Sequence, residues 1–166
     1  NSGKIYANYD SSNTFSDSNK TDYFNNVTSI NNLNLLDTSQ ARTLAYMFNY
    51  TQSVTRLDVS NFNTSNVTSM RALFQRNEKL TSIDVSHFDT SNTTDLAGMF
   101  GYCSKLTSID VSHFDTSKTT NMASMFYRND SLLYLDVSNF NTSNVTSMRG
   151  MFTQKDHLHT RNLTID

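Results

Sequence analysis

The sequence predicts an α/β repeat solenoid, in which a right-handed coil carries a parallel β-sheet on one face and short helical turns on the other. The first observation is a motif, Val-Ser-Asn/His-Phe, that begins at Val59, Val85, Val111 and Val137, a spacing of 26 residues each time. The second is composition, because 66 of the 166 residues are Asn, Ser or Thr and yet aromatic residues make up 11%. Disordered chains rarely carry so much apolar bulk, so we expect the polar residues to form the shell of an ordered repeat.

The units start at Leu57, Ile83, Ile109 and Leu135, and a degenerate first unit begins near Asn31. We therefore expect residues 1–30 to form an N-terminal extension or cap, and residues 31–166 to form about five units and a partial sixth. Residues 161–166 would begin the sixth strand and leave it uncapped, which indicates a fragment of a longer array.

Each unit is expected to open with a short strand. Alternation sends Ile83 and Val85 inward, while Ser82 and Asp84 face outward. Phe88 follows as a second buried column. A unit this small cannot bury its own apolar face, so successive units must stack, with parallel strands about 4.8 Å apart.

A turn and a helical segment are expected to complete the unit. Met70, Leu73 and Phe74 have the i, i+3, i+4 spacing of one helix face, with Ser or Thr upstream as candidate N-caps. In the turn before them, one slot holds Asn in some units and Asp in others. Because the two residues share a side-chain acceptor but not a charge, we expect this slot to close an Asx-turn. That slot holds Asn63, Asp89, Asp115 and Asn141.

Composition excludes several classes of function. Lys and Arg total 13 against 15 acidic residues and never stand side by side, so the chain lacks the basic clusters that a nucleic-acid-binding surface needs. No apolar run is long enough to insert into a membrane, and four glycines without proline leave no phosphate-binding loop. Cys103 is the only cysteine, so an internal disulfide is impossible.

These repeats resemble the BspA-like leucine-rich-repeat surface proteins of Gram-positive bacteria and mycoplasmas, whose 26-residue unit carries Leu-Asp-Val-Ser-x-Phe-Asp-Thr-Ser-x-Val-Thr-x-Met-x-x-Met-Phe-x-x-Cys-x-x-Leu. The match covers Leu33 to Leu163. The resemblance implies a leucine-rich-repeat-like coil, a secreted or surface location, and adhesion through a protein or glycoprotein ligand on a host surface or matrix. It implies no catalytic residue and no cofactor.

The chain departs from the family pattern at two slots. The cysteine slot holds Thr51, Asn77, Asn129 and Lys155 in other units, so we expect Cys103 to be a semi-buried structural thiol. Phe88 stands where better-known leucine-rich repeats place an asparagine that bonds the turn, so their coil geometry does not transfer in detail.

Residues that break the repeat are the candidate binding residues. The stretch after each helical triplet varies most between units, and its Tyr and Arg side chains are of the types that dominate protein interfaces. They are Tyr50, Arg76, Tyr102, Tyr127 and Arg128, while Arg56 and Tyr134 interrupt the small polar column of the strand face. Ordinary surface variation is the alternative explanation.

The strand face also carries Asp58, Asp84, Asp110 and Asp136, each two residues before a serine. A solvated face or acceptors for turn hydrogen bonds explain them simply, because neighbouring carboxylates in water repel by only about 1 kcal/mol. Calcium between Asp84 and Asp110, or a basic partner, is the alternative.

His87 and His113 fill one slot that holds Asn in the flanking units. This interchange favours exposed hydrogen-bonding residues over zinc ligands, because zinc would need further ligands nearby. We expect no metal.

No nucleophile, base and orienting group can be assigned, so we expect no enzyme. The first hypothesis is an extracellular adhesion module, and the second is a spacer that projects another domain. A third is a hydroxyl array that binds ice or carbohydrate. This array would use Thr64, Thr90, Thr116 and Thr142 with Thr68, Thr94 and Thr120. The sequence does not determine the oligomeric state.

Overall fold

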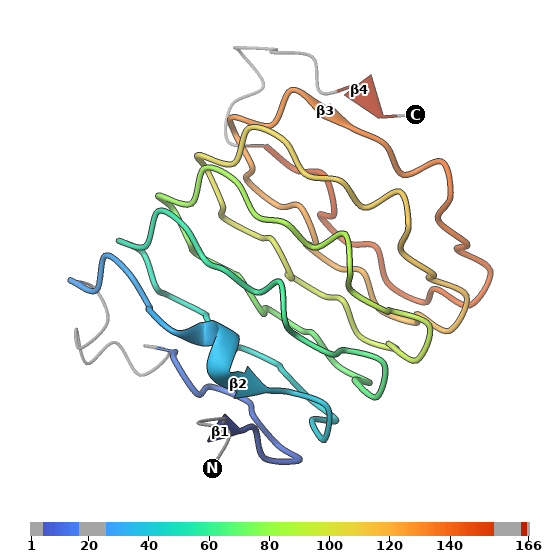
Figure 1. Cartoon of the computed structure of the whole chain (residues 1–166). Helices are drawn as coiled ribbons and strands as arrows, with labels where there is room; N and C mark the ends of the chain where they lie inside the picture. The colour runs from blue at the N-terminus through green and yellow to red at the C-terminus, as the bar shows by residue number, and fades with distance from the viewer. Residues whose placement is uncertain (1–4, 17–25, 155–163, 166) are drawn as a thin grey trace.

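The computed structural model describes residues 5–16, 26–154 and 164–165. The chain winds through successive coils of similar outline that stack along one axis, with the two termini at opposite ends of the stack (Figure 1). The predicted repeat coil is therefore confirmed. The predicted partial sixth unit lies outside the described residues except at positions 164–165.

Regular secondary structure is sparse in the described chain. β1 (Ile5–Tyr6) pairs in parallel with β2 (Leu36–Asp37), and a 3-10 helix, η1 (Leu33–Leu35), precedes β2. At the other end of the stack, β3 (Tyr134–Leu135) pairs in parallel with β4 (Thr164–Ile165). Each element is only two or three residues long, so other contacts must hold the coils together.

The prediction of helical turns on one face is wrong, because the described residues contain no α-helix. The triplet Met70, Leu73 and Phe74 is fully buried as expected, but it lies in a run of turns. The Met70 and Phe74 N–H groups donate to the carbonyls of Asp95 and Met99 in the next coil, at 3.0 and 2.9 Å. A helix would have used these donors within its own turn, whereas stacking uses every second N–H between coils.

Left-handed backbone makes this alternation possible. Two slots have positive φ in each of the segments 44–50, 70–76, 96–102 and 122–128, and alternate N–H groups there bond to the next coil. Glycine fills one of them at Gly98, where a Cβ atom would lie 2.8 Å from the side-chain nitrogen of Gln75. Non-glycine residues accept the same conformation elsewhere, at Tyr46, Tyr50, Ala72, Arg76, Tyr102, Ser124 and Arg128.

The predicted sheet over the unit starts is also largely absent. Ile83 and Val85 point inward and Ser82 and Asp84 outward, as expected, but residues 26–154 form one backbone bond between coils at this face, from Thr107 N–H to Thr81 C=O at 3.4 Å. An Asx-turn begins immediately after each unit start and leaves too few residues for a ladder. Parallel pairing runs instead through isolated bridges that join Asp10, Thr43, Ser69, Asp95, Asn121 and Ser147 in series.

A continuous column of phenylalanine rings forms the core. Neighbouring rings are nearly parallel, with centroids 5.4 to 6.1 Å apart, which is the range of favourable offset stacking. Phe62 and Phe88 pack against this column at 6.1 and 6.4 Å. The column contains Phe15, Phe48, Phe74, Phe100, Phe126 and Phe152.

Buried threonines link the coils beside this core. The Thr64 hydroxyl donates to the Asp89 carbonyl at 3.0 Å and accepts the Asp89 N–H at 2.8 Å. The Asp89 carboxylate accepts the Ser91 N–H at 2.9 Å, so the predicted Asx-turn is confirmed. Equivalent hydroxyls donate to the next coil at Thr38, Thr90 and Thr116, and equivalent turns form at Asn63, Asp115 and Asn141.

Replacing a central ring of the phenylalanine column should be costly. We expect Phe100→Ala to lower the free energy of unfolding by about 3–5 kcal/mol, because a fully buried ring with two stacked neighbours leaves a cavity. Phe15→Ala, at the partly buried end of the column, should cost clearly less. Urea unfolding of both variants is the measurement, and equal losses would contradict a continuous column.

Removing one threonine hydroxyl tests the links between coils. We expect Thr64→Val to cost about 1–3 kcal/mol, because both backbone groups of Asp89 lose their partner. Thr142→Val is the matched control, because Thr142 is exposed, and its cost should stay within about 0.5 kcal/mol. Urea unfolding should separate the two variants, and an unaffected Thr64→Val protein would refute the role of the hydroxyl.

Candidate functional site

The repeat brings four of the candidate binding residues into one row. Tyr50, Arg76, Tyr102 and Arg128 are spaced by 26 residues, so each occupies the same slot of successive coils, and each has positive φ. The Arg76 guanidinium carbon lies 4.9 Å from the Tyr50 ring centroid and 4.2 Å from that of Tyr102. Arg128 lies 5.6 Å from the Tyr102 centroid. Cations within about 6 Å of a ring face are attracted by its quadrupole.

Tyr127 completes the cluster, which we call the tyrosine–arginine column: Tyr50, Arg76, Tyr102, Tyr127 and Arg128. The Tyr127 and Tyr102 ring centroids are 5.0 Å apart and their planes are inclined by 56°. All five side chains are half-buried. Residues that the sequence singled out one unit at a time thus form one contiguous surface.

The charges of this column are not neutralised by acidic partners. Neither guanidinium makes a hydrogen bond or ion pair with another described residue, and each lies within about 6 Å of a tyrosine ring centroid. By contrast, Arg71 forms an ion pair with Asp95 at 3.5 Å. Two half-buried cations without counter-ions favour an anionic ligand.

The aspartates of the strand face act as turn acceptors. In each case one carboxylate oxygen accepts the N–H and the hydroxyl of the serine two residues later, and these bonds lower the carboxyl pKa. The described residues contain no group of three His, Cys, Asp or Glu placed to hold a metal ion, so Asp84 and Asp110 have no third such ligand. The aspartates are Asp58, Asp84, Asp110 and Asp136.

Arg56 lies in a groove of about 500 Å³ between two coils of this face. Asp58 and Asp84 line the same groove, so the structure brings these three candidates together. Tyr134 does not line this groove. It lies in β3 and is half exposed.

His87 and His113 bond to the preceding coil. Their Nε2 atoms lie 2.7 and 2.9 Å from the carbonyl oxygens of Val59 and Val85, which can only accept, so each ring nitrogen donates. Both rings are exposed and contact the neighbouring phenylalanine edge-on. The predicted hydrogen-bonding role is therefore confirmed.

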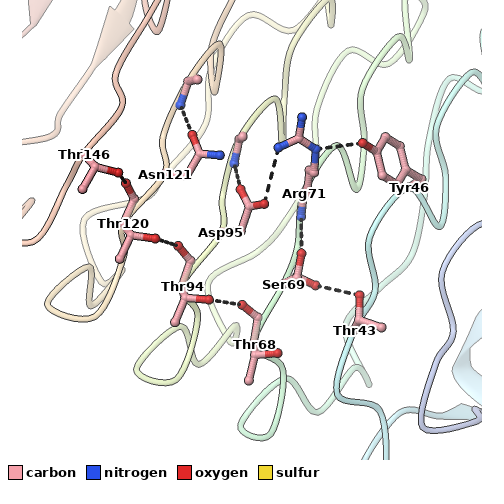
Figure 2. A network of polar contacts seen from close by, with 12 residues as sticks. Thr43, Tyr46, Thr68, Ser69, Arg71, Thr94, Asp95, Thr120, Asn121 and Thr146 are labelled. Carbon is pink, nitrogen blue, oxygen red and sulfur yellow. Dashed lines mark hydrogen bonds and ion pairs between the residues drawn. The ribbon is translucent and has the colours of Figure 1, made fainter.

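Sequence reasoning missed the polar network in Figure 2. Arg71 Nε donates to the Tyr46 hydroxyl at 2.8 Å, while its guanidinium pairs with Asp95. Tyr46 and Arg71 each break a column of small residues, which was the available signal. They escaped notice because they stand 25 residues apart and so occupy neighbouring slots rather than one.

The threonine columns divide into two kinds. Thr64, Thr90 and Thr116 are buried and bonded to backbone, so they cannot belong to an exposed hydroxyl array. A second column is exposed, and each of its hydroxyls donates to a carbonyl of the preceding coil, as Figure 2 shows in part. This exposed column is Thr68, Thr94, Thr120 and Thr146.

Cys103 is fully buried rather than semi-buried, which corrects the sequence-based expectation. Its Sγ donates to the Phe74 carbonyl at 3.1 Å, in the slot that also holds Thr51, Asn77 and Asn129. Burial raises the pKa of the Cys103 thiol from 9.0 to about 12. The neutral thiol therefore contributes stability that is present below pH 9 and is lost as pH rises toward 12.

Thiol labelling tests this burial. We expect Cys103 to resist a thiol-reactive dye in the native protein at neutral pH and to react fully in urea, because only unfolding exposes it and restores its ordinary pKa. Absorbance of the released dye anion measures the reaction. Rapid labelling of the folded protein would show that the slot is open to solvent.

Comparison with known proteins adds a family. The family model described as "Mycoplasma protein of unknown function, DUF285" matches residues 18–127 and residues 103–164. No curated protein and no solved structure matches the chain. Within the part of the chain that the structure describes, no helix is both long and apolar enough to cross a membrane. Because the two matches together extend over most of the sequence, the chain belongs to the DUF285 family.

Proposed function

We propose that this chain is an extracellular repeat module of a bacterial surface protein and that it binds a protein or glycoprotein ligand on a host surface or matrix. The observation that carries the proposal is the tyrosine–arginine column, where Arg76 lies between the rings of Tyr50 and Tyr102. The resemblance to BspA-like leucine-rich-repeat proteins supports the surface location and the adhesive role.

The physical case depends on order as well as on composition. A few residues carry most of the binding energy at protein interfaces, and Tyr and Arg are enriched among them. In this column each side chain packs on its neighbours, so it loses less conformational entropy on binding than a free surface side chain. The surrounding coils repeat the same small polar residues and offer little else that could distinguish one ligand from another.

The spacer hypothesis makes the opposite prediction about these residues. A stalk needs only the phenylalanine column and the links between coils, so its performance should not depend on Arg76 and Arg128. A ligand-binding module needs the column itself.

Adhesion of the protein to mucin, matrix proteins and epithelial cells tests the proposal. We expect the double variant Arg76→Gln/Arg128→Gln to bind at least about tenfold more weakly, because both charged groups of the column are lost. The matched control is Arg42→Gln/Arg149→Gln, which removes the same charge from exposed sites outside the column and should leave binding unchanged. Circular dichroism verifies folding. Unchanged adhesion of the first variant in the full-length protein would favour the spacer.

A further inference from the structure

We infer that the tyrosine–arginine column binds an acidic peptide segment in the polyproline II conformation, with carboxylates three residues apart on Arg76 and Arg128. The inference rests on the proposed function, because it names the ligand chemistry of the same surface. Three observations carry it: the uncompensated guanidinium groups, their position in slots two coils apart, and the two inclined rings in their vicinity.

The charges select an anionic ligand. Arg76 and Arg128 have no acidic partner among the described residues, and both are half-buried, so a carboxylate would gain a charge-assisted bond that water screens only in part. Exposed Lys79 and Lys105, which share a nearby slot of adjacent coils, add positive charge. Glu78, also exposed, follows Arg76 by two residues and makes no ion pair with it.

The spacing agrees with a polyproline II conformation of the ligand. Arg76 and Arg128 are separated by two coils, and stacked coils lie about 4.8 Å apart, so the two slots are about 10 Å apart. A polyproline II segment has three residues per turn and rises about 3.1 Å per residue, so positions i and i+3 share a face about 9.3 Å apart. A β-strand places its same-face residues about 7 or 13 Å apart and matches poorly.

The rings give the intervening residues a place to pack. Tyr102 lies in the coil between the two arginines, and Tyr127 is inclined to it by 56° at a centroid distance of 5.0 Å. Aromatic surfaces of this kind are where proline-rich segments dock, because a preformed polyproline II helix loses little entropy on binding. Because both guanidinium groups lie over the Tyr102 ring, prolines at positions i+1 and i+2 would pack against Tyr127 and the edge of Tyr102.

Calorimetric titration of the whole chain with three capped peptides tests the inference. We expect a repeat of Glu-Pro-Pro to bind at least about tenfold more tightly than a repeat of Lys-Pro-Pro, which reverses the charge. It should also bind more tightly than a proline-rich peptide of equal charge whose glutamates are two residues apart. Arg76→Gln/Arg128→Gln should weaken binding of the first peptide by at least about tenfold, and Arg42→Gln/Arg149→Gln should not.

Several results would overturn the inference. Equal affinity for the three peptides would show that neither the charge nor the spacing of the side chains determines recognition. No measurable binding would exclude acidic polyproline II peptides as ligands. Tighter binding of a sulfated polysaccharide, or of a helical peptide with glutamates seven residues apart, would identify a different partner. Adhesion tests the proposed function separately. If the Arg76→Gln/Arg128→Gln variant loses adhesion while the unsubstituted protein binds none of the peptides, the inference is refuted and the proposed function stands.

Discussion

Hydrogen bonding between the backbones of successive coils is the constraint on which the rest of the structure depends. None of the described coils has an α-helix, or more than a short pair of strands, in which to satisfy its own N–H and C=O groups, so it must present them to its neighbours. The bonds from Met70 to Asp95 and from Phe74 to Met99 set the register at one repeat. Any residue in a given slot then lies beside its equivalent in the next coil.

This register explains both the stability and the candidate function. In the interior it aligns phenylalanines into one column and places the Thr64 hydroxyl against the backbone of Asp89. At the surface it turns variation along the sequence into a contiguous patch, because residues one repeat apart become neighbours. Arg76 therefore lies between the rings of Tyr50 and Tyr102 although the three are far apart in the chain.

How much of the candidate site could be predicted follows from the same geometry. The members of the tyrosine–arginine column could be recognised because they break the repeat in equivalent stretches of it. Their stacking could not be predicted, because it depends on the direction that left-handed backbone gives to each side chain. The contacts of Arg71 with Tyr46 and Asp95 went unrecognised because they join residues 25 and 24 apart, across slots rather than within one.

The sequence by itself determined the period of the repeat, the residues that face inward and the turns that Asx side chains close, because these follow from local spacing and local hydrogen bonds. Only the tertiary structure decided whether Met70, Leu73 and Phe74 would form a helix. Their spacing suits a helix, but a helix would bond each N–H within its own turn. Stacking required every second N–H to reach the next coil, so the segment became a series of turns and the inter-coil pairing moved away from the unit starts.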